Sequence, residues 1–247
     1  MNLLEIEKIL IFTGNSILIL NGILALAYLI NKPLKTKNIN LVFKWSLFAF
    51  LLGLFELFLI MFIFDNDAFF IANIRPIIRA LGIVDYSFIS SISYILKFYF
   101  FGMLFSLIFA NKRVQRIFIF LTWGLLLFEL IMIFYFKSYQ SYDSVSSTVK
   151  NIFILSGSGL LLYRTYKAEI SNIYLYKNTY FWIGFALFIT ALTEIFLEFI
   201  FSQLQLSDLV SFYKLYLVRN AFQVAFFIMM IIAFLNTKYL RFLPEKY

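Results

Sequence analysis

Apolar stretches separated by short polar connections recur along the whole chain. Each stretch approaches the roughly 20 residues that an α-helix needs to cross a bilayer. The pattern predicts an all-α integral membrane protein, a single seven-helix transmembrane domain over residues 1–247 without a soluble domain. The predicted spans are 9–30, 43–64, 87–110, 117–136, 149–166, 180–201 and 212–235.

The fifth stretch is the least regular, because Lys150 and Asn151 lie at its start and Arg164 lies near its end. The distribution of charge supports it as a span. The first, third and fifth connections and the C-terminal tail are basic, whereas the N-terminus and the other connections are neutral or acidic. Because cytoplasmic loops are enriched in Lys and Arg, seven helices with the N-terminus outside and the C-terminus in the cytoplasm fit this distribution.

The composition agrees with a multi-pass protein of the cell (inner) membrane, with the lipid bilayer as its main partner. Hydrophobic residues make up 63% of the chain and aromatic residues 21%. The net charge of +8 comes from 21 Lys and Arg residues beside apolar segments, which indicates membrane topology rather than nucleic-acid binding. The absence of His and Cys excludes thiol nucleophiles, His-dependent zinc sites and Ser-His-Asp catalysis. We therefore expect no enzyme, no catalytic residue and no cofactor.

Six ionisable residues interrupt the predicted spans. At about 1.5 Å per residue, five of them lie about 10 to 15 Å below the outer boundary and the sixth about 5 Å below it. A charge in hydrocarbon costs at least about 2.5 to 3.5 kcal/mol, so this polar layer needs partners or water. Its members are Glu56, Lys97, Glu129, Glu194 and Arg219, with Glu198 as the shallow one.

Uncharged polar residues extend the layer, since Asn220 and Gln223 lie beside Arg219 on the last span. We expect Lys97, Glu194 and Arg219 to point into the bundle and Arg219 to pair with Glu194. The candidate ligand- or ion-binding residues are Glu56, Lys97, Glu129, Glu194, Glu198, Arg219, Asn220 and Gln223; the pattern does not specify a metal.

Four carboxylates against two cations leave the layer with a formal excess of two negative charges. Either one or two carboxyl groups carry protons, or a cation or cationic ligand lies among them. The competing interpretation is that these residues hold the helices together, as interhelical polar contacts do in membranes.

Related sequences surround three of the glutamates: LFELFLIMFIF around Glu56, LFELIMIFYF around Glu129 and LTEIFLEFIF around Glu194. One interpretation is an internal repeat of a helical hairpin. The other interpretation is that apolar sequences of low complexity resemble one another by chance.

Two shorter segments have distinct patterns. Arg75 and Arg79 share one face of a segment that is otherwise apolar, which predicts a short interfacial helix or a lid over the outer mouth. The run Ser156-Gly157-Ser158-Gly159 lies inside an apolar span and lacks the lysine of a phosphate-binding loop. It predicts close helix packing.

Three functions fit a polar layer confined to the outer half. We expect a sensor or signalling-type subunit that binds a small ligand, cation or protons and signals to a cytoplasmic or membrane partner protein. The layout is similar to the seven-helix input modules that bacteria attach to sensor kinases and transcription regulators. The alternative is a proton- or cation-coupled transporter or channel, although no proline breaks a predicted span. The second alternative is a structural subunit of a membrane complex.

Overall fold

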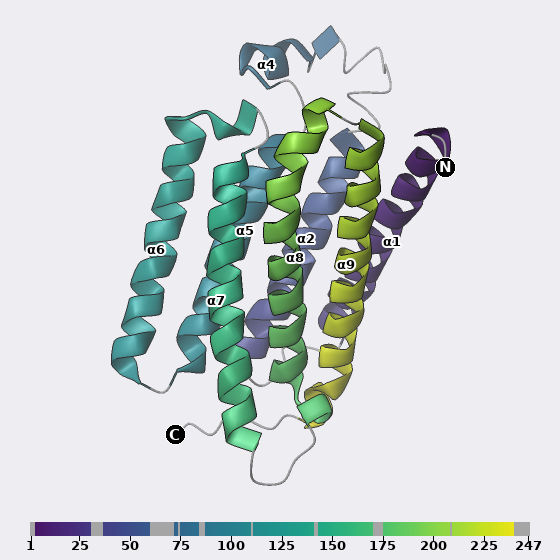
Figure 1. Cartoon of the computed structure of the whole chain (residues 1–247). Helices are drawn as coiled ribbons and strands as arrows, with labels where there is room; N and C mark the ends of the chain where they lie inside the picture. Colours follow the sequence, from purple (N-terminus) through teal and green to yellow (C-terminus); the bar gives the residue numbers. More distant parts are fainter. Residues whose placement is uncertain are drawn as a thin grey trace.

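The computed structural model describes residues 3–30, 37–59, 72–73, 75–83, 87–109, 111–140, 143–169, 175–207 and 209–239. The regular secondary structure within these ranges is helical, and no strand occurs among them (Figure 1). The α-helices are α1 (Leu3–Ile30), α2 (Lys37–Leu59), α4 (Arg75–Ala80), α5 (Ser87–Ile108), α6 (Lys112–Phe134), α7 (Ser144–Glu169), α8 (Thr179–Ser207) and α9 (Leu209–Leu235). Short 3₁₀ turns are η2 (Ser138–Gln140), η3 (Leu175–Lys177) and η4 (Asn236–Tyr239).

Seven of these helices are long and apolar enough to cross a membrane. The prediction of an all-α chain with seven candidate spans is therefore confirmed, while the orientation of the termini across a bilayer stays a prediction. The predicted end of the second span, residues 60–64, lies outside the described residues. We call the end of the bundle at which α4 lies the outer end, following the predicted orientation (Figure 1).

The fifth span begins earlier than predicted, at Ser144 instead of residue 149. Asp143 is the reason, because its Oδ1 accepts hydrogen bonds from the backbone N–H groups of Val145 and Ser146, both at 3.0 Å. An aspartate in this position satisfies the unpaired N–H groups of a first helical turn. The serine-rich segment that resembled a connection is thus the first turn of α7, and Lys150 lies inside the helix.

Six of the long helices close into a ring. Neighbouring helices pack in the order α1, α2, α5, α7, α8 and α9, and α9 packs against α1 again. The remaining long helix, α6, packs against α5 and η2 outside this ring, and Figure 1 shows it at one edge of the bundle. In the apolar stretch of α5, 56% of the residues are buried, against 11% in α6, so α5 is the central helix and α6 the peripheral one.

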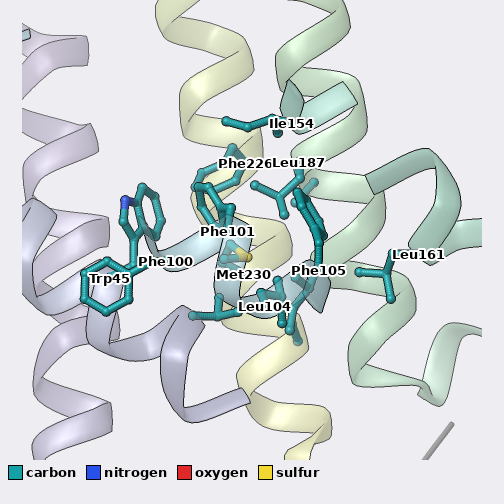
Figure 2. Packing of buried hydrophobic residues seen from close by; sticks show 14 of the residues in the cluster. Trp45, Phe100, Phe101, Leu104, Phe105, Ile154, Leu161, Leu187, Phe226 and Met230 are labelled. Atoms are coloured by element: carbon teal, nitrogen blue, oxygen red, sulfur yellow. The ribbon is translucent and has the colours of Figure 1, made fainter. Parts of the chain in front are cut away.

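Large aromatic residues fill the ring below the predicted polar layer. Phe101 and Phe105 of α5 are almost fully buried, and the Trp45 ring of α2 lies 5.0 Å from Phe101 and 5.7 Å from Phe226 of α9, measured between centroids. Figure 2 shows the rings of Phe101 and Phe105 among side chains from α2, α7, α8 and α9. The same cluster includes Leu104, Ile154, Leu161, Leu187 and Met230.

Close approach of α5 to α7 depends on Gly157. A Cβ atom at this position would overlap the ring of Phe105, whereas a Cβ at Gly159 would make ordinary contacts at 3.5 Å and beyond with Phe188 of α8. The expectation that this run of small residues serves helix packing is confirmed at Gly157.

At the inner end, Arg164 of α7 holds the C-terminus of α5. Its guanidinium donates a hydrogen bond to the carbonyl oxygen of Ile108 and lies 5.2 Å from the centroid of the Phe109 ring. The last carbonyl groups of a helix have no partner within the helix, so this contact supplies one and ties the two helices together below the aromatic core.

We expect Gly157→Ala to destabilise the protein by about 1 to 3 kcal/mol, because the buried ring of Phe105 has little room to move. Gly159→Ala is the matched control, since it adds the same methyl group to the same helix without overlap. Thermal unfolding in detergent measures the difference. Equal melting temperatures for the two variants would contradict the close packing of α5 and α7.

Candidate functional site

A buried ion pair joins α7 to α8. The Nζ atom of Lys150 donates a hydrogen bond to Oε2 of Glu194 at 2.7 Å, and the two residues are only 1% and 7% exposed. Because α7 begins at Ser144, Lys150 lies about 9 Å below the outer end of that helix. A short bond between opposite charges compensates each for the loss of water.

Arg219 of α9 approaches the other oxygen of the same carboxylate. Its Nη2 atom lies 3.9 Å from Oε1 of Glu194. The predicted pairing of Arg219 with Glu194 is therefore confirmed, although Lys150 is the closer partner. Glu194 consequently lies between a cation from α7 and a cation from α9.

Two further contacts extend this site towards α5 and the outer end. Glu198, one turn above Glu194, accepts a hydrogen bond through Oε2 from the hydroxyl of Ser147 at 3.1 Å. The Nζ atom of Lys150 lies 5.1 Å from the centroid of the Tyr94 ring on α5, within the range of a cation–π contact. We call Tyr94, Lys97, Ser147, Lys150, Glu194, Glu198 and Arg219 the charged cluster.

Lys97 enters the cluster from α5, about one turn below Tyr94. Lys150, Arg219 and Glu194 all act on it electrostatically. Across the described ranges, Lys97 forms no ion pair and no side-chain hydrogen bond. It is therefore a partly buried cation near two other cations.

Glu56 of α2 lies at the edge of the cluster, half-buried and within electrostatic range of Arg219. With Glu56 added, the charged cluster has three carboxylates, Glu56, Glu194 and Glu198, and three cations, Lys97, Lys150 and Arg219. The predicted excess of two negative charges does not hold inside the ring, because Lys150 belongs to the cluster and Glu129 does not. A bound cation is thus not required for neutrality.

The other predicted site residues lie elsewhere. Glu129 is on α6, outside the ring, and is 0% exposed. Asn220 is buried and donates from Nδ2 to the hydroxyl of Thr13 on α1 at 2.9 Å, so it joins two helices rather than facing Glu194. Gln223 is half-buried, one turn beyond Arg219 on α9. Of the eight candidates, the cluster contains Lys97, Glu194, Glu198 and Arg219, with Glu56 beside it.

Lys150 is the important residue that the sequence prediction missed, together with its neighbour Ser147. The predicted boundary at residue 149 placed Lys150 at a helix end. The signal that would have located it is Asp143 followed by three serines within four residues, which is a helix-start pattern.

A separate apolar pocket of about 280 Å³ opens near the outer end, where α5, α6 and η2 meet the turn after α4. The side-chain amide of Gln140 donates to the carbonyl oxygen of Leu81 at 3.3 Å and so ties that turn to η2. The short helix predicted around Arg75 and Arg79 is confirmed as α4. The pocket is lined by Leu81, Ile83, Phe88, Ser91, Ile92, Ile133 and Tyr139.

We expect Lys150→Met to destabilise the protein by about 3 to 5 kcal/mol, because it leaves Glu194 without its nearest cation. Combining it with Glu194→Gln should recover part of the loss, since both members of the pair are then uncharged. Lys97→Met is the matched control and should be milder, because Lys97 has no ion pair in the described part of the chain. Chemical or thermal unfolding of these three variants beside wild type checks this. An equal loss of stability for the two single lysine variants would contradict the assignment.

Comparison with protein-family models, with curated proteins and with solved structures finds no match to this chain. The geometry of the charged cluster is therefore the basis for a functional proposal.

Proposed function

We propose that this chain is a membrane-embedded sensor, a signalling-type subunit that binds a small acidic ligand at the charged cluster. The observation that carries the proposal is the division of the ring into two halves. Charged side chains from four helices meet in the outer half, and aromatic packing fills the half beneath them.

The division supports sensing over transport. Over the described ranges, the charged residues that are buried are Glu129, Lys150 and Glu194, and all three lie in the outer half. Below them, Phe101, Phe105 and Met230 are almost fully buried. A solute that entered the cluster would meet this core instead of a polar path to the inner end.

The arrangement of charge supports an acidic ligand. Three cations surround one carboxylate, Glu194, and Lys97 lacks an ion pair among the described residues. Arg219 is the more exposed partner of Glu194, with 24% of its side-chain surface accessible. A carboxylate or phosphate group that bound Lys97 and also reached Arg219 would supply the negative partner that Lys97 lacks among the described residues.

A binding event at this position would act on helix packing. Glu194 is shared between Lys150 of α7 and Arg219 of α9, so an acidic ligand that engages Arg219 competes with Glu194 for it. The ligand then favours the arrangement of α8 and α9 in which Arg219 has moved towards the ligand. We propose that a partner protein on the cytoplasmic side of the cell membrane reads this change, because the basic connections of the chain are predicted to face that side.

The experiment is a thermal-stability panel of the purified protein with small carboxylic acids, organic phosphates and amines at constant pH. A ligand at about 100 times its dissociation constant adds about 2.7 kcal/mol, so we expect an acid to raise the melting temperature by about 5 to 10 °C. Lys97→Met should abolish this shift, whereas Lys112→Met, at the other end of the bundle, should keep it.

Stabilisation that persists in Lys97→Met would contradict the proposed site, and stabilisation by amines alone would contradict its charge preference. Liposomes that contain the protein separate sensing from transport: the proposal requires binding without flux of the stabilising acid. Flux that Lys97→Met abolishes would establish a transporter instead.

A further inference from the structure

Glu129 is a buried carboxyl group whose oxygens accept no hydrogen bond within the described structure. It lies on α6, near its outer end, in the contact between α6 and the ring, and is 0% exposed. Within the described structure, neither of its carboxyl oxygens accepts a hydrogen bond and no Lys or Arg forms an ion pair with it. Glu194 lies at a similar depth but has Lys150 at 2.7 Å. An ionised Glu129 would thus lack the compensation that its counterpart in the ring has.

The group beside Glu129 is the hydroxyl of Ser146, in the first turn of α7. Ser146 is itself 0% exposed and donates its hydroxyl proton to Oδ2 of Asp143 at 2.6 Å. An ionised carboxylate only accepts hydrogen bonds. Because Ser146 has a single hydroxyl proton, it can donate to Asp143, as in the 2.6 Å bond, or to an ionised Glu129, but not to both.

A protonated Glu129 resolves this conflict. Its O–H can donate to the free lone pair of Ser146, which donates to Asp143, so that each hydrogen has an acceptor. Asp143 is half-exposed at the outer end of α7 and is anchored by the N–H groups of Val145 and Ser146. The resulting chain of hydrogen bonds runs from the buried carboxyl group to a side chain that solvent reaches.

We propose that Glu129 is a proton-binding site of the folded protein, connected through Ser146 and Asp143 to the outer side. This site is distinct from the charged cluster, since it lies between α6 and the ring and not inside the ring. Among the described elements, α6 packs mainly against α5 and η2. Because Glu129 lies where α6 meets the ring, its protonation makes the packing of α6 against the ring depend on pH.

Asp143 is the charged group that acts on Glu129, whereas the other titratable groups on neighbouring elements have contacts elsewhere. Asp143 precedes α7 and is the one charged residue that influences Glu129 among those described. On α5, Tyr94 and Lys97 belong to the charged cluster and interact with its other members. On η2, Tyr139 lines the apolar pocket. A second carboxylate nearby makes a negative charge on Glu129 still less favourable. Because the proposed hydrogen-bond chain needs the proton of Glu129, we expect the stability of the folded protein to fall as pH rises.

Infrared difference spectroscopy of the purified protein between mildly acidic and mildly alkaline pH tests the site directly. We expect wild type to show the carbonyl band of a protonated carboxyl group, and Glu129→Gln to lose it. Glu198→Gln is the matched control, because it removes a carboxylate that already accepts a hydrogen bond from Ser147, and it should keep the band. Over the same pH range, the melting temperature should fall in wild type and stay nearly level in Glu129→Gln.

If Glu129→Gln does not fold, Ser146→Ala provides the second test: removing the acceptor of the Glu129 proton should shift the band without abolishing it. The proposal is wrong if wild type lacks the band, if the band survives unchanged in Glu129→Gln, or if Ser146→Ala leaves its frequency unaltered. It is also wrong if Na⁺ or Ca²⁺ stabilises wild type at alkaline pH but does not stabilise Glu129→Gln, because the site would then hold a metal ion.

Discussion

The relative heights of the helices in the ring depend on the ion pair between Lys150 and Glu194. Neither side chain has water to solvate it, so each requires the other. Their 2.7 Å contact fixes the height of α7 relative to α8 and brings Ser147 level with Glu198 one turn above. Arg219 links α9 to this pair through Glu194, and Tyr94 links α5 to it through Lys150. Four helices are thus aligned by one carboxylate and the residues around it.

Apolar packing complements this alignment without specifying it. Rings such as Phe101 and Phe105 fill space in the inner half, but aromatic contacts between long apolar helices tolerate sliding along the helix axes. Gly157 and Arg164 restrict the sliding at two further heights on α7, one against the ring of Phe105 and one against the end of α5. Polar contacts and close approaches therefore determine register, while the aromatic residues supply most of the buried surface.

Much of the fold could be predicted from the sequence, because hydrophobic length is a strong signal for spans and α4 has a readable two-sided pattern. The composition of the site could be predicted only in part. Arg219 and Glu194 were expected to pair from their depths alone, and they do. The depth of a residue does not say in which direction its side chain points around the helix axis. The sequence therefore could not show that Asn220 faces α1 or that Glu129 lies outside the ring. Lys150 was missed because a polar first turn resembles a loop until its aspartate cap is recognised.

The ion pair also has a consequence for how the protein is made. Lys150 and Glu194 lie on consecutive helices, joined through a short inner connection that includes η3. During synthesis, a lysine that enters the bilayer on α7 would remain uncompensated until α8 follows. Because the next span delivers its carboxylate, the two helices can insert together as a hairpin that is already neutral at this depth. Assembly of the charged cluster can then begin before α9 has left the ribosome.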